Sequence, residues 1–358
     1  MESLSCWSER TLAFMSHVLR VGELKTEAAA LLSLLQTNLS PLIDGHRMDW
    51  LYRLCPHGEA RVWVAAEEST GRLVGAASVF PRKLYLNGEL VNGFVLGDFC
   101  VAKEHRSMGL ALRLQRKCLE YVQDGRFAAG YDLPSKSMLA IYQRIGMKAE
   151  GSMVRMVKLL RADEKIAARV PFGPAAKVMS GAVNSVLALG KFALRLRTSA
   201  ELKLQQGKCQ KEFTELANSI GNRLGTCVDR SAEYLNWRFL SHPQHKYEIL
   251  TARYHGKLAG YLVFFQEGKK AAVADWFCQE PRKLRKDLIR GLVKLLNARG
   301  CESVHAAVLA DHAYYSDLLS LGFRPRESSS VIFLRPNGEA NAAAGNTNWL
   351  LMDGDREG

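Results

Sequence analysis

Residues 95–111 read VLGDFCVAKEHRSMGLA, an apolar run followed by a turn of basic and small residues. The apolar run predicts a buried strand, and residues 110–122 have the period of an amphipathic helix. A glycine at a helix start lets backbone N–H groups approach an anion closely, at the positive end of the helix dipole. We therefore expect a phosphate-binding loop at residues 106–111.

Two further elements follow this loop. Residues 126–132 predict a strand, and residues 135–146 predict a helix that ends in the segment YQRIGM at residues 142–147. The R-x-x-G-x-A pattern of the loop and the Y-x-x-x-G-M segment resemble the coenzyme A loop and the following helix of the GCN5-related N-acetyltransferase (GNAT) superfamily. The resemblance covers residues 40–160 well and residues 230–335 in outline.

The sequence also contains an internal repeat with a period of about 180 residues, which is too long for a solenoid and indicates a duplicated domain. Four pairs of segments recur in the same order: DWLYRLCPH (49–57) with NWRFLSHP (236–243), GRLVG (71–75) with GKLAG (256–260), GDFC (97–100) with ADWF (274–277), and IGM (145–147) with LGF (321–323).

The resemblance and the repeat together imply a mixed α/β protein with two tandem GNAT folds, each a mostly antiparallel sheet flanked by helices. We expect a catalytic domain at residues 1–160, a basic helical linker at 161–211, a GNAT-like domain at 212–335 and a flexible tail at 336–358. The tail prediction rests on the abundance of Ala, Asn and Gly in residues 336–346.

The second copy lacks the residues that make the loop of the first copy. Residues 280–285 read EPRKLR, with an acid and a proline in place of the glycine, and Leu318 stands where the first copy has Tyr142. We therefore expect the second copy to keep the fold and to have lost coenzyme binding, so that the chain carries one active site.

The resemblance implies a role for each site residue of the first copy. Tyr142 matches the tyrosine that donates a proton to the coenzyme sulfur in many members. Asp98 lies where many members place the base that accepts a proton from the amine, and a hydrogen-bonded strand acid is an equal alternative. Ser135 replaces an asparagine that is frequent in the family. The implied coenzyme-binding residues are Phe99, Cys100, Val101, Arg106, Ser107, Met108, Gly109, Leu110, Ala111 and Ser135.

The function implied is the transfer of an acyl group from acetyl coenzyme A, or another acyl coenzyme A, to an amine of a small molecule. An amino sugar or another cell-envelope precursor is the preferred acceptor. Two alternatives stay open: a module that senses acyl coenzyme A without turnover, and a relative of the tandem-fold transferases that use aminoacyl-tRNA.

The charge of the chain is concentrated in one region. The net charge is +13, and residues 151–211 contain twelve Lys or Arg against three acidic residues. Residues 177–195 contain no acid and place their apolar residues on one helical face. We expect this helix, at 177–197, either to contact an anionic membrane peripherally or to pack between the domains. With no RNA-binding motif or zinc finger in the chain, specific nucleic-acid binding is not expected.

The cysteines and the start of the sequence favour a cytoplasmic protein, either free or peripheral at the inner face of the membrane. The eight cysteines are scattered without C-x-x-C pairs, which predicts reduced, buried thiols and no metal site. The first ten residues, MESLSCWSER, carry an acid where a signal peptide carries bases.

Overall fold

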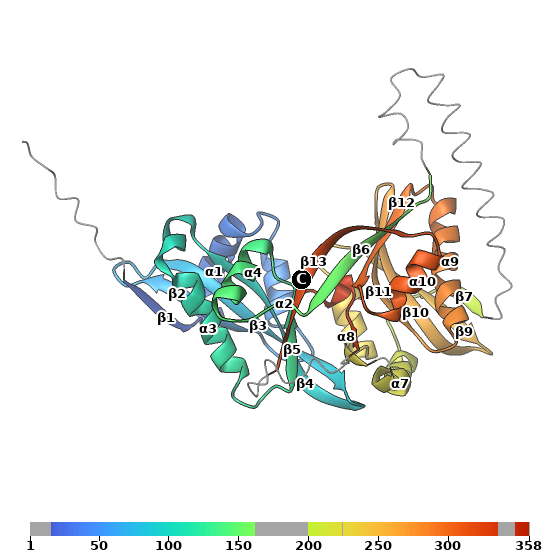
Figure 1. Ribbon diagram of the computed structural model, residues 1–358, viewed down its shortest axis with the longest axis horizontal. Helices are drawn as coiled ribbons and strands as arrows, with labels where there is room; N and C mark the ends of the chain where they lie inside the picture. Colours follow the sequence, from blue (N-terminus) through green and yellow to red (C-terminus); the bar gives the residue numbers. More distant parts are fainter. Residues whose placement is uncertain (1–15, 162–199, 224, 336–347, 358) are drawn as a thin grey trace, which may run out of the picture.

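The described part of the chain forms one mixed sheet covered by helices on both faces. The computed structural model describes residues 16–161, 200–223, 225–335 and 348–357 (Figure 1). Its fourteen strands form a single sheet, in which twelve follow the order β1-β2-β3-β4-β5-β13-β6-β12-β11-β10-β9-β7 and β8 joins β14 to β3. The parallel pairs are β4 with β5, β11 with β12 and β8 with β14. The predicted mixed, mostly antiparallel α/β class is confirmed.

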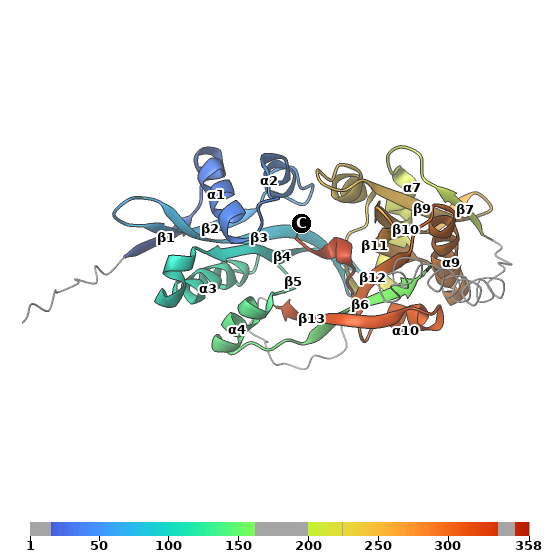
Figure 2. The same cartoon turned by 90° about the horizontal axis from the view of Figure 1, so that it is seen from above.

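The first half of the molecule, residues 16–161, begins with helices on one face of the sheet and continues with helices on the other. α1 and α2 cover one face, and α3 and α4 cover the opposite face (Figure 2). Its elements are β1 (His17–Val21), α1 (Leu24–Asn38), α2 (Gly45–Tyr52), β2 (Arg61–Glu67), β3 (Leu73–Leu86), β4 (Glu89–Val101), the 3-10 helix η1 (Lys103–Met108), α3 (Leu110–Val122), β5 (Ala129–Asp132), α4 (Lys136–Arg144) and β6 (Gly151–Leu159).

The second half, residues 200–335, repeats this arrangement of strands. β9, β10, β11 and β12 have the order and directions of β2, β3, β4 and β5. Its elements are β7 (Glu201–Leu204), α7 (Lys211–Ile220), η2 (Gly221–Arg223), β8 (Thr226–Val228), α8 (Ala232–Leu235), the π-helical turn η3 (Asn236–Leu240), β9 (Tyr247–Tyr254), β10 (Lys257–Glu267), β11 (Lys270–Cys278), α9 (Arg282–Ala298), β12 (Ser303–Leu309), α10 (Ala313–Ser320) and β13 (Arg324–Leu334).

Local sequence signals explain the elements around the site. α3 buries Leu110, Leu114 and Cys118 along one face, as the amphipathic pattern of residues 110–122 predicts. Ser135 caps the N-terminus of α4, where its hydroxyl accepts a hydrogen bond from the Met138 N–H at 3.2 Å. Gly146 follows α4 with a φ of +87°, a left-handed conformation that favours glycine.

The two halves exchange their last strands. β6 leaves the first half and pairs with β12 over residues 153–159, whereas residues 332–334 of β13 return to pair with residues 130–132 of β5. Each half therefore completes its sheet with a strand from the other, and the boundary predicted at residue 160 does not separate the two sheets. The sequence does not reveal this exchange, because β6 and β13 would each be buried whether they paired within their own half or with the other half.

The repeated tryptophans meet at the contact between the halves. The indole N–H of Trp50 donates to the Trp237 carbonyl at 2.8 Å, and the indole N–H of Trp237 donates to the Trp50 carbonyl at 2.9 Å. The two rings stack with centroids 4.9 Å apart. Arg238 lies over the ring of Trp50, and Arg82 lies over the ring of Trp237. This reciprocal contact relates equivalent segments of the repeat.

The flexible tail predicted for residues 336–358 is wrong for its described part. Residues 348–357 form β14 (Trp349–Leu350) and the 3-10 helix η4 (Asp353–Asp355), and they run between the two halves (Figure 1). Trp349 and Leu351 are buried in the first core, and the carboxylate of Asp355 accepts a hydrogen bond from buried Arg230 at 2.8 Å. The composition that suggested flexibility belongs to residues 336–347, which lie outside the described residues.

Most of the predicted linker also lies outside the described residues. The amphipathic helix expected at residues 177–197, and with it the expected membrane contact, falls within residues 162–199. The described end of the linker forms β7, which pairs with β9 and so belongs to the second half. Among the described residues, no helix is both long and apolar enough to cross a membrane.

Candidate functional site

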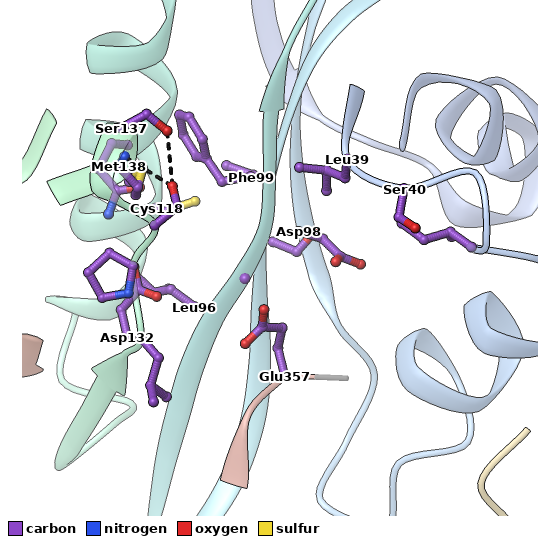
Figure 3. Close-up of a pocket in the computed structure, with 18 of the residues that line it drawn as sticks. Leu39, Ser40, Leu96, Asp98, Phe99, Cys118, Asp132, Ser137, Met138 and Glu357 are labelled. Carbon is purple, nitrogen blue, oxygen red and sulfur yellow. Dashed lines mark hydrogen bonds between the residues drawn. The ribbon is translucent and has the colours of Figure 1, made fainter. Parts of the chain in front are cut away.

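A gap opens in the first half where β4 and β5 separate. Residues 129–131 of β5 pair with residues 93–95 of β4, and no described strand pairs with residues 96–101 on that side. A cavity of about 420 Å³ lies at this gap. Its lining comes from both sides of β4, and includes residues 39, 40, 42, 43, 96–99 and 132–135 together with Glu357 (Figure 3).

The predicted phosphate-binding loop lies beside this gap. Gly109 has a φ of +69° and precedes α3, whose first-turn N–H groups have no partner inside the helix. A Cβ added to Gly109 would meet nothing within 4 Å, so the space beside this residue is open. Leu110 is buried beneath the loop, Arg106 is exposed, and the backbones of Ser107 and Met108 form the end of η1. These features fit a bound pyrophosphate.

The free edge of β4 carries the three predicted strand residues. Phe99 is partly buried and lines the cavity, whereas Cys100 and Val101 are buried. The Val101 carbonyl accepts a hydrogen bond from the Arg106 Nε at 3.0 Å, which ties the strand to the loop. Burial raises the pKa of the Cys100 thiol to about 12, so this cysteine is not a ready nucleophile.

Asp98 lies in a β-bulge, on the face of β4 opposite Phe99 (Figure 3). Two residues of β4 face one residue of β3 at this point, and Asp98 takes a left-handed φ of +43°. Its carboxylate accepts hydrogen bonds from both terminal nitrogens of Arg47, each at 2.9 Å, and from the Tyr52 hydroxyl at 2.8 Å. The structure thus places Asp98 at the cavity but engages its carboxylate with three donors.

Tyr142 does not line the cavity itself but lies behind the side chains of Asp132 and Gln115. Its buried hydroxyl donates to the Asp132 carboxylate at 2.6 Å and accepts from the Gln115 side-chain amide at 3.0 Å. Asp132 and Gln115 both line the cavity. Burial raises the pKa of Asp132 to about 7, and burial followed by the nearby Asp132 charge raises the pKa of Tyr142 well above its usual value. The pair can hold a proton next to the cavity.

The remaining predicted coenzyme-binding residues lie at the two ends of the gap. Ser135 lines the cavity, but its hydroxyl also caps α4 and shares a hydrogen bond with the Ser137 hydroxyl at 3.0 Å. Ala111 lies in the first turn of α3, behind the loop. The ten predicted coenzyme-binding residues thus lie at the end of β4, in η1 and the turn after it, at the start of α3 and before α4, and Cys100, Val101 and Leu110 are buried among them.

Sequence reasoning missed several residues that complete this site. Arg47 and Tyr52 come from α2, and the repeated DWLYRLCPH segment marks their neighbourhood without indicating their contact with Asp98. Asp132 ends β5 and lies within the predicted strand, so its burial was not apparent. Glu357 reaches the cavity from the far end of the chain, and no local pattern indicates that approach.

Glu357 packs directly against Gly97. A Cβ added to Gly97 would lie 2.5 Å from the Cγ of Glu357, so the close approach requires glycine at this position. Burial, with a further contribution from the charge of Asp98, raises the pKa of Glu357. Among the described residues, no cation forms an ion pair with this carboxylate.

The equivalent gap of the second half is filled. β11 pairs with β12 over residues 270–273 and then separates from it as β4 does from β5. Trp276, at the repeat position of Phe99, is fully buried and packs on Tyr314 with ring centroids 4.2 Å apart. At the start of α9, Asp317 forms ion pairs with Arg282 and Arg285. Among the described residues, these side chains occupy the start of α9 and the space that corresponds to the open loop before α3.

Comparison with family models found one match. Residues 34–149 match the acetyltransferase (GNAT) domain family, and this range contains α2, the loop, α4 and the cavity lining except Gln244 and Glu357. A search of curated proteins found no match.

Comparison with solved structures found relatives that span both halves. A GCN5-related N-acetyltransferase from Anabaena variabilis is 14% identical, with 90% of this chain and 73% of that chain covered at a TM-score of 0.64. A probable N-acyltransferase from Enterococcus faecalis is 12% identical, with coverage of 91% and 74% and a TM-score of 0.65. Saccharomyces cerevisiae N-myristoyltransferase with bound myristoyl-CoA is 14% identical, with coverage of 93% and 84% and a TM-score of 0.55. At these identities the likeness shows the fold.

Proposed function

We propose that the chain is an acyltransferase that moves an acetyl group from coenzyme A to the amine of a small molecule, because residues 34–149 match the acetyltransferase (GNAT) domain family. The observation that carries this proposal is the open gap between β4 and β5 directly beside the glycine loop. A thioester arm that lies in this gap has a phosphate site at one end and an acceptor cavity at the other.

The residues of the first half fit coenzyme A. The open, positively polarised loop at residues 106–111 suits the pyrophosphate, and the unpaired edge of β4 at residues 99–101 suits the amide groups of the pantetheine arm. When bound, coenzyme A supplies an activated thioester carbonyl. A backbone N–H of residues 99–101 then has the position to polarise that carbonyl.

Proton transfer on the thiol side is assigned to Tyr142 and Asp132. The departing thiolate needs a proton, and the Tyr142 hydroxyl is bound to the Asp132 carboxylate and to Gln115, the two side chains that line the cavity in front of it. With a pKa near 7, Asp132 can hold a proton at neutral pH and return it to Tyr142 after transfer. Tyr142 keeps the proton-donor role predicted from the sequence.

Proton transfer on the amine side involves Asp98 and Glu357. Asp98 is held in a fixed orientation by Arg47 and Tyr52, which suits a residue that organises the site. Glu357 has no such partner and lies on the same side of β4 (Figure 3). We therefore assign Asp98 to positioning and electrostatics, and we give direct acceptance of the amine proton to Glu357.

The described residues do not test the argument for an amino sugar or cell-envelope precursor as the acceptor. The preference for an amino sugar or cell-envelope precursor rested on a membrane contact of residues 177–197, which lie outside the described residues. The described part of the site supports a small amine as the acceptor. The seven described cysteines are buried and unpaired, which supports the cytoplasmic setting expected from the sequence.

The proposal is tested with the full chain, acetyl coenzyme A and a panel of amines, with release of the free thiol as the measurement. Amine-dependent thiol release at a rate above hydrolysis supports the enzyme. Tight binding of acetyl coenzyme A without thiol release for any amine favours the acyl-coenzyme A sensor instead. The absence of coenzyme binding contradicts both.

A further inference from the structure

The acceptor side of the cavity is built from segments that are far apart in the sequence. The connection between α1 and α2 contributes Leu39, Leu42 and Ile43, and the second half contributes Gln244. The side-chain amide of Gln244 donates to the Leu42 carbonyl at 2.7 Å, which fixes the two loops against each other. Glu357 approaches from the C-terminal segment on the same side of β4 (Figure 3).

The C-terminal segment is held in place by side chains from both halves. Arg238 donates to the Gly354 carbonyl at 2.7 Å and to the Arg356 carbonyl at 3.0 Å. Arg230 donates to the Asp355 carboxylate at 2.8 Å, and the Tyr131 hydroxyl donates to the Asp355 carbonyl at 2.6 Å. These contacts fix the two residues before Glu357, so the carboxylate is delivered to the cavity by a rigid segment.

The charges that line the cavity are predominantly negative. Its described lining contains three carboxylates, those of Asp98, Asp132 and Glu357, and one guanidinium, that of Arg47. The guanidinium is bound to Asp98 through both terminal nitrogens. The site therefore attracts a cation and repels an anion. The negative charge of Asp98 lies near Glu357 and strengthens the attraction for a cation, because a positive group between the two carboxylates is favoured.

The mouth of the cavity is apolar. Leu39 is 44% exposed and Leu42 is 77% exposed. Both line the cavity next to buried Ile43. An acceptor with an apolar body can cover this lip while its amine lies deeper in the cavity.

We propose that the acceptor is a primary amine with an apolar body and no carboxylate, bound with its ammonium group on Glu357 and its body on Leu39 and Leu42. This inference rests on the proposed function, and it narrows the acceptor class. It disfavours amino sugars, which lack the apolar body, and α-amino acids, whose carboxylate would lie among the acidic side chains.

The transfer balances with these residues. The bound ammonium gives one proton to the Glu357 carboxylate, which later releases it to water. The neutral nitrogen then forms the C–N bond with the thioester carbon, and the C–S bond breaks. Tyr142 gives a proton to the departing thiolate and regains one from Asp132, while the second proton lost by the nitrogen passes to water, from which Asp132 is reprotonated. The products are the N-acyl amine, free coenzyme A and one proton.

The test uses three acceptors that differ by one group each. Phenethylamine has the proposed features, phenylalanine adds a carboxylate, and phenylalanine methyl ester removes that charge again. We expect kcat/KM for phenethylamine to exceed that for phenylalanine by about 100-fold or more, and the ester to recover most of the difference. Glucosamine should be poorer than phenethylamine by about tenfold or more.

Variants connect this selectivity to the proposed residues. Glu357→Gln should lower kcat/KM for phenethylamine roughly 10- to 100-fold and reduce the discrimination against phenylalanine, with coenzyme affinity and melting temperature unchanged. Leu42→Ser should raise KM for phenethylamine and leave methylamine unaffected. Glu327→Gln, in an exposed ion pair between β13 and Arg155 of β6, is the matched control and should change nothing.

Two outcomes distinguish failure of the proposed acceptor class from failure of the proposed acyltransferase function. Turnover that is equal or faster with phenylalanine or glucosamine, or an unchanged Glu357→Gln variant, overturns the acceptor class and leaves the acyltransferase intact. Loss of thiol release with every amine overturns the proposed function, and the acceptor class with it.

Discussion

The gaps between β4 and β5 and between β11 and β12 have the same backbone plan and opposite contents. In the first half, Phe99 lines an open cavity beside Gly109, which has free space before it. In the second half, Trp276 stands at the position of Phe99 and packs against Tyr314, while Asp317 binds two arginines at the start of α9. The separation of strands therefore belongs to the fold, and the coenzyme site depends on which side chains leave it open.

A second difference concerns the residue at which the two strands of each half begin to separate. Asp132 follows Tyr131, whose partner is Val95. The repeat alignment and the strand register place Ala306 at the equivalent position of the second half. The carboxylate with a raised pKa and the tyrosine bound to it are thus confined to the open gap, where a proton is needed.

The largest expected effect concerns the glycine loop. Gly109→Glu introduces a side chain and a negative charge where we place the pyrophosphate, so calorimetry should detect no binding of acetyl coenzyme A, whereas the parent should bind one molecule per chain. Gly256→Glu is the matched control, because Gly256 also has a positive φ, +79°, and open space around it. Control and parent should bind alike.

Two results would break the comparison at this point. A stoichiometry of two equivalent sites per chain would mean that the second gap opens in solution. Unaltered affinity in Gly109→Glu would move the phosphate site away from the first gap.

The next effect concerns the stability cost of Asp132. Its pKa is raised from 3.8 to about 7, so both folded and unfolded states are protonated below pH 3.8 and this group then costs nothing. As the pH rises from 3.8 to about 7, the unfolded state ionises while the folded state keeps its proton, so the native protein loses roughly 4 kcal/mol of stability across this range. Asp132→Asn still accepts a hydrogen bond from Tyr142 and should therefore melt higher than the parent at pH 8. At pH 4 the two should melt alike, and a constant difference across this range would contradict the assignment.

A smaller effect is expected from the two buried tyrosines. Tyr142→Phe should lower kcat by about 10²-fold, because it removes the proposed proton donor while the coenzyme site is untouched. Tyr314→Phe is the matched control, because Tyr314 is equally buried and no described group bonds to its hydroxyl. With chemistry shown to be rate-limiting, equal rates for the two variants would return Tyr142 to a packing role.

The smallest expected effect concerns a feature that the two halves share, the reciprocal hydrogen bonds of Trp50 and Trp237. Trp50→Phe and Trp237→Phe each remove one indole N–H and leave one buried carbonyl without its donor. We expect each to lower the free energy of unfolding by about 1 to 2 kcal/mol, and the two losses to agree closely. Urea unfolding of both variants measures this. Strongly unequal losses would show that the contact is less symmetric in solution than its geometry indicates.

Sequence patterns predicted the parts of the fold that depend on local spacing. Helix α3 has the predicted bounds, 110–122, and α4 begins one residue after the predicted helix start, Ser135. The loop glycine and the resemblance to the GNAT family were apparent for the same reason, because adjacent residues form one backbone turn. The repeated tryptophan segments likewise indicated two related halves.

The missing parts of the prediction depend on contacts between distant segments. Arg47 meets Asp98 across 51 positions, and Glu357 reaches Gly97 from the other end of the chain. The exchange of β6 and β13 leaves no mark on either strand, because alternation of apolar residues reports burial and not the identity of the neighbour. Asp132 was overlooked because a single acid at a strand end is normally exposed.

The strand exchange has a consequence for biosynthesis. The half that carries the cavity is translated first, yet its β5 edge stays uncovered until residues 332–334 leave the ribosome, some two hundred residues later. Until then the nascent chain presents an open strand edge, and a pairing so distant in sequence forms slowly. Dividing the gene near codon 160 would remove β6 from the second half and β13 from the first. The first half can therefore complete its sheet only after the second half has been synthesised.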